Sequence, residues 1–407
     1  MPAANDVLQT LDTTNAWQEE LYIHLHKNPE LSMQETETAA EITKRLESFG
    51  YDVQQIGGGV VGLMANGEGP TVLFRADIDA LPVEEKTGLE YASTKTAIDK
   101  AGNTVPLMHA CGHDMHIAAG LGAAELLSQN KDKWSGTYIA LFQPGEETAE
   151  GATAMVNDGL VDKVPRPDVA LGQHVLTVPA AGEVGTTAGP MLSTGACIRV
   201  TVWGKGSHGS MPHLGVDPVL LGAAIVQRLQ GIVSREIAPS QFGVVTVGSF
   251  QAGTKANIIP DSAQLLLNIR AYDTEVRKTL ISAIERIVKA ECEASGSPKP
   301  PEIELYESYP LTDNDEIVSE RITDAFRSYF GTDRVKKLAP IPASEDFSNI
   351  PTAWGIPYSY WGFGGFTEGM TVLPNHNPGF APAIQPSLRT GTEAAVVAIL
   401  AYLGKDQ

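Results

Sequence analysis

The sequence predicts a two-domain α/β protein, in which a larger α/β domain with a central mixed sheet is interrupted by a smaller inserted α+β domain. Three observations predict this architecture. A chain of 407 residues exceeds the size at which one hydrophobic core usually stops growing. Strand and helix patterns alternate over its first half, as in a sheet covered by helices. This rhythm changes around Gly189–Pro190.

The elements of the larger domain follow from hydrophobic periodicity and from turn residues. After a helical region at Ala16–Phe49 they are, in order, strand Thr71–Ala76, helix Met115–Gln129, strand Thr137–Phe142, helix Gly151–Asp158 and strand Asp168–His174. Near the other end of the chain, the apolar run Ala394–Leu403 has about ten residues, which suits a buried helix rather than a membrane span.

The inserted domain is expected to have a β-α-β-β-α order, which is enough for a small ferredoxin-like fold. Its elements are strand Ala196–Trp203, a helix with Asp217 as N-cap and Pro218 at its first position, strands Gly243–Phe250 and Ala263–Tyr272, and helix Thr274–Ala294. The polar, Pro-rich Ser295–Pro301 marks its end, and Glu302–Tyr306 with two later helical regions is expected to return to the larger domain. We therefore place the larger domain at residues 1–189 and 307–407, and the inserted domain at 190–306.

Composition excludes several classes of protein. A net charge of −20 and a pI near 4.8 argue against nucleic acid and against an anionic membrane surface as partners. The first residues lack the basic start and apolar run of a signal peptide. Three scattered cysteines are too few for a disulfide framework. These features predict a cytoplasmic protein.

The segment His109-Ala-Cys-Gly-His-Asp-Met-His116 is the strongest chemical signal, because it packs a thiol and three imidazoles into eight residues before a helix. Cys111 and His113 are two residues apart with Gly112 between them, so both can reach one metal ion. A metal and a helix N-terminus would both favour the thiolate of Cys111. A lone histidine would be read as a satisfied polar side chain, but this cluster predicts metal binding.

Two adjacent carboxylates end the segment Phe142-Gln-Pro-Gly-Glu-Glu147. A buried metal can hold one of them as a ligand while the other takes and returns a proton. Taken alone, the pair would more readily be interpreted as the first turn of a helix, where acidic residues are favoured by the helix dipole.

Other polar groups lie where predicted strands end. His174 closes the strand Asp168–His174, and Asp77 and Asp79 follow the strand Thr71–Ala76. Ligands of open α/β sheets bind outside the carboxyl ends of the strands, so these groups are candidates for one site. His376, in the turn-rich Pro374-Asn-His-Asn-Pro378, would by itself be read as a surface residue.

Together, Met108-His-Ala-Cys-Gly-His-Asp-Met-His116, Gln143-Pro-Gly-Glu-Glu147, Gln173-His174 and His376-Asn-Pro resemble the M20 metallopeptidase family. The likeness is strongest to its amidohydrolase branch, which includes hydrolases of hippurate, auxin conjugates and N-acyl amino acids. It extends from His26-Lys-Asn-Pro-Glu-Leu-Ser32 to the C-terminal helix.

The resemblance implies a two-metal site and a role for each residue. Its five ligands would be Cys111, His113, Glu147, His174 and His376. Glu146 would be the general base, and Asp79 would orient a ligand, although a structural turn is an alternative for Asp79. Two divalent ions are expected, with zinc first and manganese, cobalt or nickel as alternatives.

The inserted domain resembles the lid and dimerisation domain of the family, which implies a homodimer or a higher homo-oligomer. His208 would contact the tetrahedral intermediate, in relatives often from the partner subunit, while Asn257 and Arg270 would bind the substrate carboxylate. Gly204-Lys-Gly-Ser-His-Gly209 also matches a dinucleotide-binding pattern. Pro212 and Pro218 delay the helix that such a site needs, and no suitable acid follows about 20 residues later.

The sequence therefore predicts a metal-dependent amidohydrolase that cleaves N-acyl amino acids, with a small-molecule substrate and without nucleic acid or membrane partners. A dipeptidase or carboxypeptidase of the same superfamily is the nearest alternative. From other classes, a non-catalytic small-molecule-binding protein and a nucleotide-dependent oxidoreductase stay open.

Overall fold

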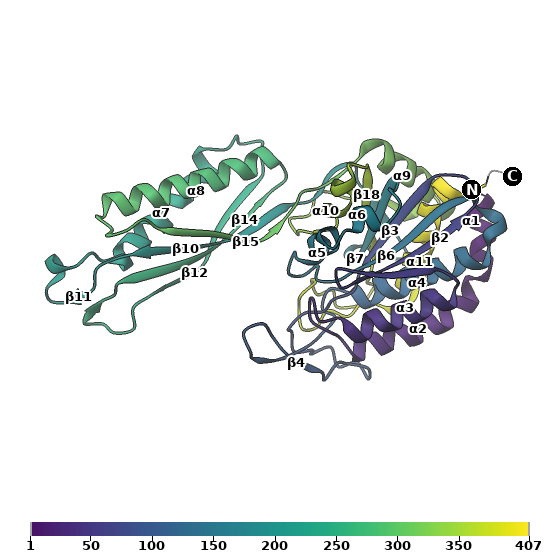
Figure 1. The fold of residues 1–407 in the computed structure, drawn as a ribbon, viewed down its shortest axis with the longest axis horizontal. Coiled ribbons are helices and arrows are strands. Elements are labelled where there is room, and N and C mark those ends of the chain that lie inside the picture. Colours follow the sequence, from purple (N-terminus) through teal and green to yellow (C-terminus); the bar gives the residue numbers. More distant parts are fainter. Residues whose placement is uncertain (1, 406–407) are drawn as a thin grey trace. The chain divides into compact units, whose positions relative to one another are not determined.

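A computed structural model describes residues 2–405, which form two compact units (Figure 1). The larger unit contains the chain up to Met191, the segment Asp313–Ala339 and the chain from Asp346 on. The smaller unit contains Leu192–Thr312 and Pro340–Glu345. Each unit has its own cluster of buried hydrophobic side chains. No described helix combines the length and the apolar character that a membrane span requires.

A mixed eight-stranded sheet is the centre of the larger unit. Across the sheet its strands are β1 (Asp52–Ile56), β2 (Gly59–Asn66), β6 (Gly136–Gln143), β3 (Thr71–Asp77), β7 (Val169–Ala181), β18 (Tyr358–Gly364), β8 (Val184–Thr186) and β17 (Val335–Lys337). The four central strands β6, β3, β7 and β18 are parallel, while β1 and β2 add an antiparallel edge. Strand β3 is buried at six of its seven positions, as expected for a parallel strand covered on both faces.

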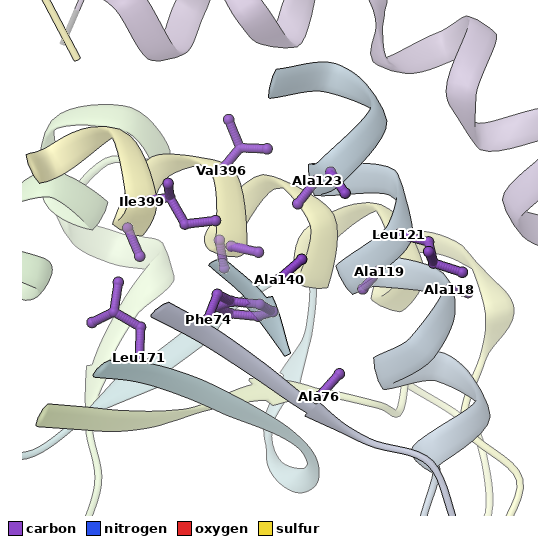
Figure 2. Close-up of a cluster of buried hydrophobic side chains, with 14 of the residues drawn as sticks. Phe74, Ala76, Ala118, Ala119, Leu121, Ala123, Ala140, Leu171, Val396 and Ile399 are labelled. Carbon is purple, nitrogen blue, oxygen red and sulfur yellow. The ribbon is translucent and has the colours of Figure 1, made fainter. Parts of the chain in front are cut away.

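Two buried helices cover the central strands on one face (Figure 2). Helix α4 (His113–Gln129) is rich in alanine and glycine, which lets it pack closely against its neighbours. A Cβ atom at Gly122 would lie only 2.0 Å from Nε2 of Gln18 on helix α2 (Leu11–Lys27). Helix α11 (Ile384–Leu403) contains the apolar run Ala394–Leu403, which is buried except at Ala401 and Tyr402.

The other helices of the larger unit are α1 (Pro2–Val7), α2 (Leu11–Lys27), α3 (Thr36–Ser48), α5 (Gly151–Asn157), α6 (Leu160–Lys163), α9 (Glu316–Phe330) and α10 (Asn349–Trp354). A short hairpin of β4 (Thr96–Ile98) and β5 (Thr104–Pro106) lies in the loop that follows β3. The helical region predicted at Ala16–Phe49 is in fact two helices, because the chain leaves the helical conformation between Asn28 and Glu35. Pro29 lies in this break and cannot donate a helical hydrogen bond.

The smaller unit is a four-stranded antiparallel sheet with two helices packed against it (Figure 1). Its strands, in order across the sheet, are β12 (Gly243–Ala252), β14 (Ser262–Ala271), β10 (Thr194–Trp203) and β15 (Glu302–Tyr309). Alternate residues of β14 are buried, which gives the sheet one covered face. Asp217 and Asp273 accept backbone N–H groups at the starts of α7 (Pro218–Arg235) and α8 (Thr274–Ala294).

Strand β15 belongs to the smaller unit. The sequence pattern suggested that Glu302–Tyr306 resumes the larger domain, although the bounds 190–306 include this segment in the inserted domain, and β15 pairs with β10 in the sheet of the smaller unit. A two-stranded ribbon of β11 (Ser207–His208) and β13 (Ile258–Ile259) completes this unit.

Candidate metal centre

The candidate ligands lie at the carboxyl ends of neighbouring parallel strands. Strand β3 ends at Asp77 and leads to Asp79, β6 leads into the loop with Glu146 and Glu147, and β7 carries His174. Helix α4 begins at the same edge of the sheet with His113, two residues after Cys111. This is the edge at which ligands bind in open α/β sheets.

Gly112 explains how Cys111 and His113 come from one turn. It has φ +84°, a left-handed conformation that glycine adopts without strain. A Cβ atom at Gly112 would also lie 2.4 Å from Cγ1 of Val175. The chain can therefore reverse direction tightly against β7 only with glycine at this position.

All five predicted ligands are brought together. Cys111, Glu147 and His376 offer ligand atoms within 4.8 Å of one another, with 3.2 Å between Oε2 of Glu147 and Nε2 of His376. His113, Glu146 and Glu147 form a second such group. The Sγ atom of Cys111 lies 3.4 Å from Nε2 of His174. Glu147 belongs to both groups, as a residue shared between two ion positions would.

Two buried atoms in this cluster lack a hydrogen-bond partner among residues 2–405: Nε2 of His113 and Oε1 of Glu147. They lie 3.9 Å apart. Nδ1 of His113 lies 2.9 Å from the backbone oxygen of Asp79, which can only accept, so a neutral His113 would present its lone pair at Nε2. Because buried polar atoms are normally paired, this arrangement fits a cation that both atoms would bind.

His174 is also held in a metal-binding form. Its Nδ1 donates to the carbonyl of Val175 at 2.7 Å, which leaves the lone pair of Nε2 facing Cys111. Burial, together with the nearby His116, holds the pKa of His174 well below its usual range. The imidazole is therefore neutral, which is the form that ligates metals.

Asp79 connects two of the candidate ligands. Its Oδ1 lies 3.1 Å from Nδ1 of His113, and its Oδ2 accepts the backbone N–H of Glu147 at 3.0 Å. Burial would raise the pKa of Asp79, but hydrogen bonds from His113 and Ser32 hold it below its usual value. These contacts agree with a role for Asp79 in orienting ligands.

The loop before α11 carries His376, whose backbone N–H donates to Ala110 at 2.7 Å. His376 has φ +70°, an uncommon conformation for a residue other than glycine. Hydrogen bonds to Cys111 and Glu147 raise the pKa of His376 to about 11. Cys111 and Glu147 therefore surround His376 with groups that favour a positive charge.

His116 and Asp77, which sequence reasoning placed near the site without a specific role, form a neighbouring network. With His113 and His174 they make a further group of possible metal ligands. However, Nε2 of His116 accepts the N–H of Val175 at 2.8 Å, and Nδ1 contacts Asp77 at 2.5 Å. Both ring nitrogens of His116 therefore already have partners, and His116 contacts the middle of β7 at Val175. His116 lies three residues after His113 on the same face of the helix. This spacing could have predicted that the two side chains lie close together.

The other predicted site residues lie in the smaller unit. His208 is exposed on β11, and Asn257 directly precedes β13, where its carbonyl accepts the N–H of Gly209 at 2.8 Å. Arg270 lies near the other end of β14, opposite Gly195, whose missing Cβ leaves room for the guanidinium. Within this unit, Arg270 is therefore separated from His208 and Asn257. The glycine-rich segment around Gly206 leads into β11 rather than a helix, so it lacks the geometry of a dinucleotide site.

A mixed α/β sheet with histidine, cysteine and carboxylate side chains gathered at the carboxyl ends of its strands defines a metal-dependent hydrolase of the α/β class. Comparison with known proteins makes the assignment specific. The chain belongs to peptidase family M20/M25/M40, whose model matches residues 73–401.

Several relatives are similar over most of the chain. An N-acetyl-L-cysteine deacetylase of Bacillus subtilis is 38% identical over 80% of this chain and 75% of its own. A hippurate hydrolase of Campylobacter jejuni is 35% identical over 81% and 83%, respectively. A thermostable carboxypeptidase of Saccharolobus solfataricus is 34% identical over 92% of both chains.

Solved structures of the same fold include two bacterial proteins. A putative aminohydrolase from methicillin-resistant Staphylococcus aureus has a TM-score of 0.87 and 32% identity, covering 98% of this chain and 99% of its own. A dinuclear metal-binding peptidase of the M20 family from Bacillus subtilis has a TM-score of 0.77 and 26% identity, covering 96% and 99%. The fold and family predicted from the sequence motifs are confirmed.

Proposed function

We propose that this chain is a two-metal amidohydrolase that cleaves N-acyl amino acids to a free acid and an amino acid. The observation that carries the proposal is the convergence of five candidate ligands around Glu147, with Glu146 beside them. Cys111, His113, Glu147, His174 and His376 would hold two divalent ions. When bound, such ions polarise an amide carbonyl and activate water for attack.

Glu146 would act as the general base. It is 6% exposed and lies in the group that contains His113 and Glu147. Its carboxylate would take the proton of the attacking water and deliver it to the nitrogen of the leaving amine. Burial of this group restricts access of bulk water to the proton that it carries.

Substrate recognition would use cations, since an N-acyl amino acid is an anion and the protein has a net charge of −20. Arg270 suits a carboxylate because its guanidinium can donate two parallel hydrogen bonds, and Asn257 would assist it. Arg270→Ala should therefore reduce kcat/KM for N-acyl amino acids far more than for their amidated analogues.

The names of the relatives support a substrate whose α-amino group is acylated rather than free, since they include a deacetylase and a hippurate hydrolase. The similarity to a carboxypeptidase supports a second candidate function, which is the cleavage of a peptide with a free α-amino group. For the ions, a thiolate with three imidazoles favours zinc, while manganese, cobalt and nickel also suit parts of the ligand set.

We also propose that the smaller unit is a lid and dimerisation domain. Strand β12 lies at an edge of its sheet, and α7 exposes Leu220 (71%) and Val219 (42%). Exposed edges and apolar side chains are features of surfaces that pair with another copy. Leu220→Glu should convert a dimer to monomers in analytical ultracentrifugation.

The three cysteines form no disulfide within residues 2–405, in agreement with a reducing, cytoplasmic setting.

The test of the catalytic proposal is amine release from matched N-acyl amino acids and dipeptides. Metal-depleted protein is resupplied separately with Zn²⁺, Mn²⁺, Co²⁺ or Ni²⁺. We expect turnover of N-acyl amino acids only after resupply, and little turnover of dipeptides. Higher kcat/KM for the dipeptides would establish the peptidase alternative, and full turnover without metal would refute the metal centre.

A further inference from the structure

The segment His26–Glu35, here called the α2–α3 segment, runs from the last turn of α2 to the start of α3 and precedes the residues matched by the family model. None of its side chains is a candidate ligand or the general base. Three polar residues in it are nevertheless buried, with exposures of 1% for His26, 8% for Ser32 and 5% for Glu35. Burial of polar groups is costly without partners, so each of these contacts is informative.

Ser32 holds the carboxylate that orients two ligands. Its hydroxyl donates to Oδ2 of Asp79 at 2.6 Å, the same oxygen that accepts the N–H of Glu147. The backbones also pair there, since Leu31 forms a β-bridge with Ala80. The α2–α3 segment therefore fixes the loop that follows β3.

Glu35 holds the loop that carries the two site carboxylates. Its Oε1 accepts the N–H of Gly145 at 2.8 Å, directly before Glu146. Met33 packs on the same glycine, where a Cβ atom would lie 2.6 Å from its Sδ. A hydrogen bond from Gly145 to Glu35 and a close contact with Met33 therefore hold this loop in place.

His26 holds the start of α4. Its Nδ1 lies 2.7 Å from Oδ2 of Asp114, the residue after His113, and its Nε2 lies 3.1 Å from Oε1 of Glu85. Asp114 is in the first turn of α4 and is 1% exposed. Three side chains of one segment therefore reach three separate loops of the metal centre.

We propose that His26, Ser32 and Glu35 are positioning residues that set the relative places of the loops bearing His113, Glu146 and Glu147. The inference rests on the metal centre of the proposed function but not on its substrate. The ligands come from different elements, so contacts between the segments that carry them contribute to the spacing of the ligand atoms, in addition to the pairing of β3 with β6 and β7. Groups that hold metal ligands in place typically change metal affinity or activity by about 10–100-fold.

The test measures Co²⁺ binding by full-length protein through its visible absorption, with Co²⁺ alone as the probe. Ser32→Ala removes one oxygen, and Glu35→Ala removes the acceptor for Gly145. The matched control is Glu30→Ala in the same segment, because the Glu30 carboxylate accepts N–H groups of Glu37 and Thr38 at the start of α3 instead. Ser32→Thr and Glu35→Gln keep a donor or an acceptor and serve as rescue variants.

We expect Ser32→Ala and Glu35→Ala to weaken Co²⁺ binding by roughly 10–100-fold. Glu30→Ala should lower the melting temperature of the metal-free protein without changing Co²⁺ affinity, and the rescue variants should bind nearly as the original chain does. Equal losses in all three alanine variants, or unchanged affinity in Ser32→Ala and Glu35→Ala, would overturn the inference. An original chain that binds two Co²⁺ ions but hydrolyses no N-acyl amino acid would refute only the proposed substrate.

Discussion

Glu146 and Glu147 are neighbours in sequence but differ in their surroundings. Glu147 contacts His376 through Oε2 and directs Oε1 toward His113, and these contacts agree with a role as ligand. Glu146 lies in the group that contains His113 and Glu147, within reach of the same site. The adjacent pair in the sequence does not by itself show which of the two is the ligand.

Replacing Glu146 by Gln tests the proposed roles, with Glu147 as the ligand and Glu146 as the general base. An amide cannot accept the proton of water, so kcat should fall by at least about 10²–10⁴-fold while metal content stays nearly unchanged. Metal analysis and steady-state kinetics on the same preparation give both values. Loss of metal, with substantial turnover when metal is in excess, would mean that Glu146 is a ligand.

Cys111→Ser should weaken metal affinity, because a soft thiolate is replaced by a hydroxyl that stays protonated near neutral pH. The other cysteines provide controls. Cys197 lies on β10 and Cys292 on α8, both in the smaller unit, and the same substitution there should leave metal affinity unchanged. Similar metal loss in all three variants would indicate general destabilisation instead of ligation.

His26 predicts a dependence of stability on pH. Burial opposes its charged form, but hydrogen bonds to Asp114 and Glu85 raise the pKa of His26 to about 9 from 6.5. Protonated His26 therefore stabilises the folded state. This contribution is fully present below pH 6.5 and is lost as the pH rises through about 9. The shift corresponds to roughly 3 kcal/mol.

His26→Gln should therefore destabilise the protein most near pH 6 and progressively less toward pH 10, as measured by urea unfolding of the metal-free chain. His24→Gln is the control, since His24 is exposed on the same helix. A destabilisation by His26→Gln that does not change with pH would show that folding does not raise the pKa of His26.

At the scale of elements, the turn before α4 is a critical feature of the metal centre. Gly112 and Gly50 share φ +84°, but a Cβ atom would meet Val175 only at Gly112, since nothing lies within 4 Å of the Cβ position at Gly50. Gly50→Ala should lower the free energy of unfolding by only about 1 kcal/mol, because of backbone strain. Gly112→Ala adds a steric clash beside two candidate ligands. It should therefore lower the free energy of unfolding by more than Gly50→Ala does, and it should also weaken metal binding.

Calorimetry and metal titration of both glycine variants check this prediction. If the two substitutions lower stability equally and both keep full metal affinity, then the close approach of α4 to β7 is not required for the site.

The sequence predicted local elements well and long-range contacts poorly. Helix Thr274–Ala294 matches α8 at both ends, because Asp273 caps it and its apolar face is periodic. Strand β18 was not predicted, since Tyr358–Gly364 is buried along its length and shows no alternation. For the site, Cys111 and His113 could be found from their spacing, whereas the contact of Asp79 with His113 depends on a tertiary fold that spacing does not reveal.

At the scale of the whole molecule, the candidate site residues are divided between the two units. The candidate ligands, Glu146 and Asp79 belong to the larger unit, while His208, Asn257 and Arg270 belong to the smaller one. In the proposed dimer, His208 could serve the site of its own chain or that of its partner. Subunit mixing can distinguish these two arrangements.

His208→Ala should reduce kcat far more than it raises KM, because a donor to the developing oxyanion acts mainly in the transition state. It should leave metal content unchanged, since His208 lies outside the ligand cluster. If His208 acts on the partner's site, mixing inactive His208→Ala with inactive Glu146→Gln protein restores activity after subunit exchange, because each hybrid dimer has one site with both residues intact. Fluorescence energy transfer between labelled subunits verifies the exchange. With exchange demonstrated and no activity restored, His208 would act within its own chain or would only support the structure of the lid.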